Sequence, residues 1–331
     1  MTMQTFTGIE YIKIDMANQY GLDKLTWDAR IEFITTNINN LDTLETNAKE
    51  PILFAKAKRA YRDATAKHKT GFIMGLDATA SGIQIMACLQ GCPKTAKQVN
   101  LGNTGAREDV YQVVADKMSK IVGDQLYKED VKKPVMTTFY GSKNQPEEAF
   151  GEDTPELEAF YKTLSEMLPG AMECMQDMQK CWQPTVLEHK WTLPDGHVAK
   201  VKVLNTVDKK IEIDELDHAT YTHRAYVNTP APKGLSLAAN IVHSIDGWIV
   251  REQVRKASMQ GFELLTIHDS FWASPNFMNN VRQNYLDTLK EIADSSLLED
   301  ILNEITGLKG KLTKLSNNLS STMLHSNYAL S

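Results

Sequence analysis

Most of the chain repeats apolar side chains every three or four residues, which is the spacing of an amphipathic helix. In the segment "EPILFAKAKRAYRDATAKH" this spacing follows a proline, a residue that often opens a helix. The pattern predicts helices over residues 8–36, with a break at Tyr20-Gly21, and over 50–68, 106–121, 153–182 and 236–258, followed by a mostly helical tail over 277–325.

Three shorter stretches read as strands. "GFIMGLD" (71–77) is a brief apolar run, and "WTLPDGHVAKVKVLN" (191–205) alternates around a Pro-Asp-Gly turn. "FELLTIHDSFWAS" (262–274) has two apolar arms around His268-Asp269, whereas the polar segment 217–234 reads as a loop. Helices and strands without a βαβ rhythm predict an α+β fold.

Composition narrows the class of protein. The 331 residues are 42% apolar and 24% charged, which is typical of a globular chain of about two domains, or of one domain with an inserted lobe. No apolar run approaches the roughly 20 residues that a membrane span needs, and no signal peptide is visible. The spacing of the four cysteines fits zinc poorly, so they are expected to be reduced. A net charge of −6 argues against a nucleic-acid coat protein but not against a nucleic-acid enzyme.

The stretch "VKKPVMTTFYGSK" (131–143) places a cation and an aromatic ring on one helical side. With 3.6 residues per turn, Lys132, Met136 and Tyr140 stack along that side. Such a pair could hold a triphosphate and screen a sugar, and the alternative is an ordinary amphipathic helix.

Two aspartates stand at the ends of predicted strands. Asp77 follows "GFIMGL" and Asp269 follows "ELLTIH". A carboxylate at a buried strand end loses solvation unless something pairs with it, and two of them could share divalent cations. The alternative is that each aspartate caps a turn or a helix.

Three segments taken together resemble motifs A, B and C of the bacteriophage-type single-subunit RNA polymerases. They are "DATASGIQ" (77–84), Lys132-x7-Tyr140-Gly141 and "IHDSF" (267–271), in that order. "ANQYGLDKLTWDARIEFI" (17–34), "NIVHSIDGW" (240–248) and the final "HSNYALS" are also similar to segments of that family, so the resemblance covers nearly the whole chain.

The resemblance implies a role for each motif residue. Asp77 and Asp269 would hold two Mg²⁺ ions, and Lys132 would meet the triphosphate and protonate the leaving pyrophosphate. Tyr140 and His243 would favour a ribose 2′-hydroxyl.

The resemblance also implies roles for four further residues. Lys128 and Lys24 would contact the incoming nucleotide, although the family usually has arginine at the first of these positions. Gly82 and His268 would serve the geometry of the motifs. An internal proline, Pro134, is tolerated if the helix begins near Val131, in which case Lys128 would precede it.

RNA synthesis is favoured over DNA synthesis. Related DNA polymerases carry a glutamate in motif A that blocks a 2′-hydroxyl, whereas Gly82 here leaves room for one. A DNA polymerase or primase, and a non-catalytic scaffold, are the alternatives.

The resemblance implies a right-hand polymerase with palm and fingers. It assigns residues 1–93 to the palm, 94–243 to the fingers, and 244–331 to the palm and a carboxy-terminal foot. The amino-terminal domain, the thumb and a Gly-Arg motif are expected on a second polypeptide, as in split phage polymerases.

Residues 195–232 occupy the place of the family's promoter-reading hairpin. Arg224 and Tyr226, with His223 and Lys233, are the candidate DNA contacts, and a solvated loop is the alternative. The other expected partners are a DNA template, ribonucleoside triphosphates and the RNA product, in the cytoplasm of an infected bacterial host and without a membrane.

Overall fold

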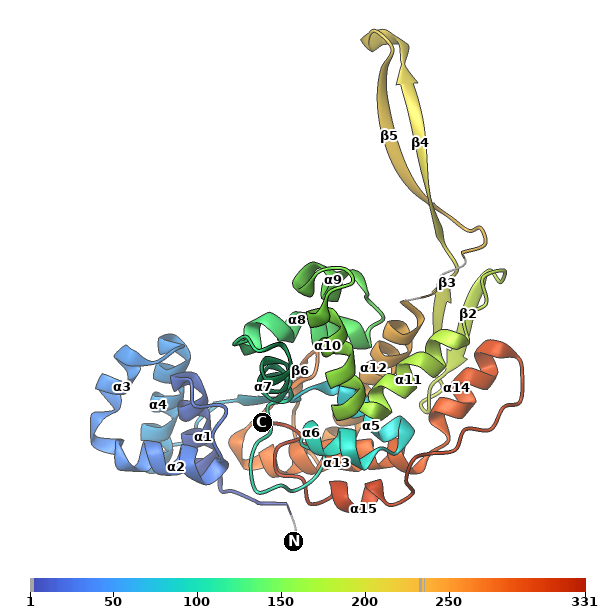
Figure 1. Cartoon of the computed structure of the whole chain (residues 1–331). Helices are drawn as coiled ribbons and strands as arrows, with labels where there is room; N and C mark the ends of the chain where they lie inside the picture. The colour runs from blue at the N-terminus through green and yellow to red at the C-terminus, as the bar shows by residue number, and fades with distance from the viewer. Residues whose placement is uncertain (1–2, 232–233, 235) are drawn as a thin grey trace.

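The computed structural model describes residues 3–231, 234 and 236–331, which form many helices and three small antiparallel sheets (Figure 1). Lys233, one of the predicted DNA contacts, lies outside the described residues. The mixture of helices with separate antiparallel sheets agrees with the predicted α+β class. Over the described part of the chain, none of the helices combines the length and the apolarity that crossing a bilayer needs.

The central sheet joins two distant parts of the sequence. Its strand order is β1 (Met74–Asp77), β7 (Ser270–Ala273) and β6 (Leu265–Ile267), all antiparallel, with Asp77 opposite Ser270. Both predicted strand regions are therefore confirmed, and the ends of the two strands meet at one edge of the sheet.

One face of this sheet is buried under helices. Alternate side chains of β1 and β7 are almost inaccessible to solvent, namely Met74, Leu76, Phe271 and Ala273. The long helices α12 (Ser236–Met259) and α13 (Met278–Asp294) pack with α5 (Ser81–Gln90), which follows β1 directly. The apolar core thus fixes the place where β1 ends and α5 begins.

Four amino-terminal helices form a group beside the sheet (Figure 1). Thr7 caps the first helix, and Gly21 ends it in a left-handed conformation with φ of 107°. The predicted break after Tyr20 is therefore confirmed. The bounds of these elements are α1 (Gly8–Tyr20), α2 (Trp27–Thr36), the 3₁₀ turn η1 (Ile38–Asn40), α3 (Leu41–Asn47) and α4 (Pro51–Thr65).

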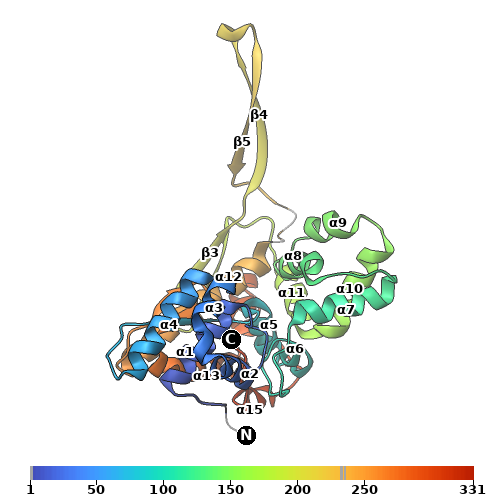
Figure 2. The same ribbon diagram turned by 90° about the vertical axis from the view of Figure 1, so that its left-hand side faces the viewer.

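A second helical group stands on the other side of α5, as Figure 2 shows. Its members are α6 (Pro93–Gln98), α7 (Val110–Val122), α8 (Lys128–Phe139), α9 (Asn144–Phe150), α10 (Pro155–Met167) and α11 (Pro169–Lys180). The stretch 153–182, predicted as helical, is confirmed as two helices, since Pro169 opens the second one.

The start of α8 differs from the prediction. We expected Pro134 to force the helix to begin near Val131, but α8 begins at Lys128 and contains Pro134. The proline ring is buried against the core, and the hydroxyl of Thr138 donates to the Pro134 carbonyl at 2.8 Å. Lys128 is therefore the first residue of the helix rather than part of the preceding loop.

The segment 217–234, predicted as a loop, contains a strand. β5 (Ala219–Val227) pairs with β4 (Asn205–Ile213) along its whole length, and this hairpin projects from the body (Figure 1). Most of its side chains are exposed, so the sequence lacks the apolar alternation that marks a half-buried strand. The predicted hairpin at 191–205 is confirmed as β2 (Glu188–Thr192) paired with β3 (Val198–Lys202).

Both ends of the chain pack together against the central helices. Gln4 N–H donates to Asn327 Oδ1 at 2.8 Å, and Arg282 Nη2 donates to the Asn327 carbonyl at 3.0 Å. The remaining elements are the 3₁₀ turns η2 (Asp214–Leu216) and η3 (Pro275–Phe277), with α14 (Leu297–Thr306) and α15 (Leu319–Met323).

Trp27 anchors the carboxy-terminal segment. Its ring is fully buried and stacks on Tyr328 at 5.3 Å, and its Nε1–H donates to the Asn327 carbonyl at 2.8 Å. Replacing Trp27 with alanine is expected to lower the free energy of unfolding by about 3–5 kcal/mol, measured by urea denaturation, because a large buried ring leaves a cavity.

The matched control is Ile52, whose side chain is 85% exposed on α4. Ile52→Ala is expected to change the free energy of unfolding by less than about 0.5 kcal/mol. Equal effects of the two substitutions would contradict the anchoring role of Trp27.

Candidate active site

A pocket of about 460 Å³ opens where the tip of the central sheet meets α5, α7, α8 and α12. Its volume is in the range, roughly 300–1,000 Å³, that is common for small-molecule sites. The residues predicted to act on metal, triphosphate and sugar all line it, namely Asp77, Asp269, Lys132, Tyr140, His243, Lys128, Lys24, Gly82 and His268.

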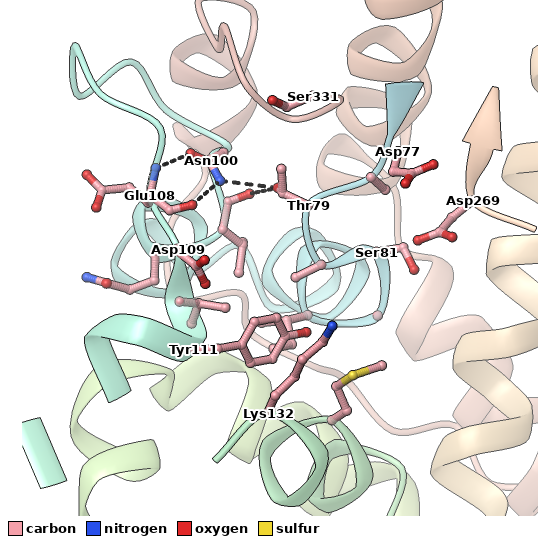
Figure 3. Close-up of a pocket in the computed structure, with 18 of the residues that line it drawn as sticks. Asp77, Thr79, Ser81, Asn100, Glu108, Asp109, Tyr111, Lys132, Asp269 and Ser331 are labelled. Carbon is pink, nitrogen blue, oxygen red and sulfur yellow. Dashed lines mark hydrogen bonds between the residues drawn. The ribbon is translucent and has the colours of Figure 1, made fainter. Parts of the chain in front are cut away.

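The two aspartates lie side by side at one wall. Asp77 ends β1, and Asp269 occupies the two-residue turn between β6 and β7, where His268 has a left-handed φ of 53°. The Ala78 N–H donates to the Asp269 carbonyl at 3.1 Å, which holds the turn against the end of β1. Figure 3 shows both carboxylates directed toward the same space. The convergence that the strand ends predict is therefore observed.

This wall carries excess negative charge. Burial raises the pKa of Asp269, and the charge of Asp77 raises it further, while hydrogen bonds from its own backbone and from Ser81 oppose the rise. A third carboxylate, Asp246, lines the same pocket from α12, and burial followed by the charge of Asp269 raises its pKa to about 6. A divalent cation would relieve this repulsion.

Four cationic side chains also line the pocket among the residues described, namely Lys24, Arg107, Lys128 and Lys132. Lys132 rises from α8 with its ammonium group directed into the pocket (Figure 3). Arg107 also lines the pocket, and neither cation has a carboxylate oxygen within 4.0 Å among the residues described. Lys24, by contrast, pairs with Asp23 at 2.6 Å, and Lys128 pairs with Asp109.

The ion pair with Lys128 also changes the pKa of Asp109. Burial by itself raises the pKa of Asp109, but the hydrogen bond and the charge of Lys128 outweigh it, and the net pKa is lowered. Asp109 in addition caps α7. Lys128 and Asp109 therefore form a structural link between the amino-terminal ends of α7 and α8.

Tyr140 and His243 form an aromatic pair over the pocket. Their ring centroids are 4.8 Å apart, with 50° between the planes. A Cβ atom at Gly82 would lie 2.9 Å from the Tyr140 hydroxyl oxygen, so the glycine makes room for the tyrosine. The predicted role of Gly82 in leaving space for a sugar hydroxyl stays a prediction.

A buried amide and the last residues of the chain hold this geometry. Gln84 Nε2 donates to the Ala329 carbonyl at 3.1 Å, and Tyr285 donates its hydroxyl to Gln84 Oε1 at 2.7 Å. Thr79 N–H donates to the same Ala329 carbonyl at 3.2 Å, and Ser331 N–H donates to the Asp77 carbonyl at 2.9 Å. Residues 329–331 therefore run alongside the segment that carries Asp77.

Sequence reasoning missed several residues of the pocket. They come from a loop, two helices and the end of the chain, namely Arg107, Asp109, Tyr111, Asp246 and Ser331. Only one had a usable signal: Asp246 lies three residues after His243 on an apolar helix, hence on the same helical side.

The candidate DNA contacts of the projecting hairpin lie apart from the pocket. Arg224 makes two hydrogen bonds to Asp208 on the facing strand, at 2.9 and 3.2 Å, whereas the Tyr226 side chain is 72% exposed. His223 is exposed on the same strand. A group of possible metal ligands, Glu212, Asp214 and His218, is exposed near the tip of this hairpin, which projects away from the helices (Figure 1).

Comparison of the whole chain with known protein families gives the class of protein. The chain belongs to the DNA-dependent RNA polymerase family, whose profile matches residues 4–328.

Several curated proteins are similar over most of this chain. The mitochondrial DNA-directed RNA polymerase 1 of Nicotiana sylvestris is 22% identical over 356 residues, which cover 89% of this chain and 35% of that protein. The mitochondrial DNA-directed RNA polymerase 1 of Arabidopsis thaliana is 22% identical over 357 residues, 89% of this chain and 36% of that protein. The mitochondrial enzyme of Neurospora crassa is 29% identical over 164 residues, 41% of this chain and 12% of that protein. The chain thus spans about a third of the length of the relatives that it matches most fully.

Proposed function

We propose that this chain is the catalytic part of a DNA-directed RNA polymerase and transfers nucleotides from ribonucleoside triphosphates to RNA on a DNA template. The observation that carries the proposal is the pocket in which Asp77 and Asp269 face Lys132, beside the Tyr140–His243 pair. Membership of the DNA-dependent RNA polymerase family supports the same conclusion.

Asp77 and Asp269 would hold Mg²⁺. Their fit is supported by the raised pKa of Asp269 and by the lack, among the described residues, of any cationic side chain within 4.0 Å of either carboxylate. Carboxylates supplemented by substrate phosphates are the ligands that Mg²⁺ prefers. When bound, two such ions supply activation of the attacking hydroxyl and stabilisation of the leaving pyrophosphate.

The chain's own side chains would orient the nucleotide. The ammonium group of Lys132, unpaired in the described residues, would neutralise the triphosphate and give a proton to the leaving pyrophosphate. Tyr140 and His243 would pack against the ribose and select its 2′-hydroxyl.

The chain would be divided into the palm and fingers regions of a polymerase. Residues 1–93 and 244–331 would form the palm, with its foot, and residues 94–243 the fingers. The packing of both chain ends around Asn327 supports a palm built from two separate segments.

The projecting hairpin would contact promoter DNA. Its exposure and its length support this role, and Tyr226 is available for stacking. Arg224 would have to exchange Asp208 for a phosphate group.

The second polypeptide stays a prediction, as do the bacteriophage origin, the phage genes as templates and the cytoplasm of an infected bacterium. The named relatives are mitochondrial and chloroplast polymerases. Purifying the chain alone and measuring elongation on a primed scaffold tests the split: robust, processive synthesis would contradict the need for a thumb-bearing partner.

The reaction is tested by extending an RNA primer on a DNA template with each class of nucleotide. Incorporation of ribonucleotides in large preference to deoxyribonucleotides is expected. Preference for deoxyribonucleotides would favour a DNA polymerase, and no incorporation in the complete complex would favour a scaffold.

Tyr140→Phe is expected to reduce the preference for ribonucleotides while synthesis continues. Phenylalanine keeps the ring contact with His243 but removes the hydroxyl group that lies against Gly82. The loss of one hydrogen bond, about 1–3 kcal/mol, corresponds to a fall of about 5- to 150-fold in the ratio of NTP to dNTP incorporation. The same change at Tyr161, which does not line the pocket, is the control. An unaltered ratio in the Tyr140 variant would contradict sugar selection by this residue.

A further inference from the structure

Arg107 is a cation of the pocket that the three motifs do not assign. It lies in the loop between α6 and α7, it is half-buried, and its Nε–H donates to Ser331 Oγ at 2.9 Å. Among the described residues, its two terminal nitrogens have no hydrogen-bond acceptor and no carboxylate oxygen within 4.0 Å. The forked end of the guanidinium is therefore available to a ligand.

Two other cations of the pocket, Lys128 and Lys24, already have carboxylate partners. Lys128 is tied to Asp109, and Lys24 is tied to Asp23 at 2.6 Å. Their charges are largely balanced within the protein. Arg107 is thus, together with Lys132, a cation of the pocket that has no carboxylate partner within 4.0 Å in the part of the chain that is described.

The loop that carries Arg107 is held firmly against the carboxylate wall. Asn100 accepts the Glu108 N–H at 2.8 Å and donates to the Glu108 carbonyl at 2.9 Å and to Thr79 Oγ1 at 3.2 Å. Ser331 connects Arg107 with the buried Arg30, whose Nη2 donates to the same hydroxyl at 2.9 Å, and with the Asp77 carbonyl through its own N–H. Arg107 is consequently held at a set position relative to Asp77.

The environment also disfavours an isolated charge at this position. Burial lowers the pKa of Arg107, and the nearby charges of Asp23 and Asp109 only partly compensate. Both of these carboxylates already form an ion pair with a lysine. An anion bound to the guanidinium would offset the free-energy cost of burying this charge.

We propose that Arg107, rather than Lys128, is the second side chain that joins Lys132 in binding the triphosphate of the incoming nucleotide. This inference rests on the proposed function. A planar guanidinium can give two parallel N–H groups to the oxygens of one phosphate, which a lysine cannot do.

The test is nucleotide binding by the full chain, measured by isothermal titration calorimetry in the presence of Mg²⁺ with ATP and AMP as probes. Arg107→Gln is expected to weaken ATP binding roughly 10- to 100-fold, the range for a charge-assisted hydrogen bond. AMP binding is expected to change less than about threefold, because AMP lacks the β- and γ-phosphates that Arg107 would bind. Arg107→Lys, which keeps the charge but not the fork, is expected to fall between the wild type and Arg107→Gln.

Three controls separate binding from structure. Ser331→Ala removes the same hydrogen bond but keeps the cation, so its loss of ATP affinity should be smaller than that of Arg107→Gln. Lys128→Gln should likewise weaken ATP binding less than Arg107→Gln. Arg59→Gln removes an exposed charge on α4, outside the pocket, and should leave both affinities unchanged.

Four results would overturn the inference. They are equal losses of ATP and AMP affinity in Arg107→Gln, an equal loss in Ser331→Ala, a larger loss in Lys128→Gln, and a wild-type chain that binds ATP no more tightly than AMP. Failure of the proposed function would show differently. Preference for deoxyribonucleotides, or no incorporation, in primer extension by the complete complex would refute that function and leave the comparison of ATP with AMP intact.

Discussion

Asp269→Asn is expected to lower the rate of nucleotide addition by about a thousandfold or more. Asparagine keeps the shape of the side chain but removes the charge that would hold a divalent cation next to Asp77. Metal ions contribute several kcal/mol to the stabilisation of charge in such transition states, and each ~1.4 kcal/mol corresponds to a factor of ten in rate. The measurement is single-nucleotide extension of an RNA primer by the complete polymerase.

Asp269→Asn is also expected to change the unfolding temperature, which can be measured without any assay of activity. Burial and Asp77 raise the pKa of Asp269, so its charged form destabilises the metal-free fold. Above the raised pKa, where the wild-type carboxylate is ionised, Asp269→Asn should unfold at a temperature equal to or higher than that of the wild type. Added Mg²⁺ should raise the unfolding temperature of the wild type more than that of the variant.

Asp124→Asn is the matched control, because Asp124 is exposed in the turn after α7 and does not line the pocket. It should leave both the rate and the response to Mg²⁺ unchanged. Normal transcription by Asp269→Asn in the complete complex would contradict the metal role.

The chemical core of this pocket could be predicted because its signals are local in the sequence. Asp77 and Asp269 each end an apolar run, and Lys132 and Tyr140 share one helical side. These short-range patterns, combined with the resemblance of the motifs, identify residues from three segments that the fold brings into one pocket.

The parts that escaped prediction depend on tertiary contacts or on unusual exposure. Arg107 and Ser331 are adjacent only because the loop before α7 and the end of the chain meet beside β1. β5 was missed because both faces of its hairpin are solvated, so no apolar alternation marks it. The start of α8 was misplaced because Pro134 was judged by its missing donor, whereas its burial in the core compensates for that loss.

Lys132→Gln is expected to have the second largest effect, a fall of about 10²- to 10⁴-fold in kcat/KM for nucleotide addition. Lys132 has no carboxylate partner among the described residues, so its charge and its protons are available to the triphosphate. The magnitude is that of a positioned general acid. Steady-state primer extension over a range of nucleotide concentrations gives kcat and KM separately.

Arg and Gln at this position distinguish binding from proton donation. Lys132→Arg keeps the positive charge but does not release a proton near neutral pH, so it should lower kcat with little change in KM. Lys132→Gln should affect both constants.

The neighbouring Lys133 provides the control, since it is equally exposed on α8 but does not line the pocket. Lys133→Gln should leave kcat and KM near the wild-type values. Equal losses from the two glutamine substitutions would point to the general charge of the helix and contradict a specific role for Lys132.

The contact of Ser331 with Asp77 has a consequence for the exchange of amide hydrogens with solvent. The Ser331 N–H donates to the Asp77 carbonyl and the Thr79 N–H donates to the Ala329 carbonyl, so the two segments hold each other in place. Separating the segments breaks both hydrogen bonds at once. These two amide hydrogens should therefore exchange at similar rates, although they lie far apart in the sequence.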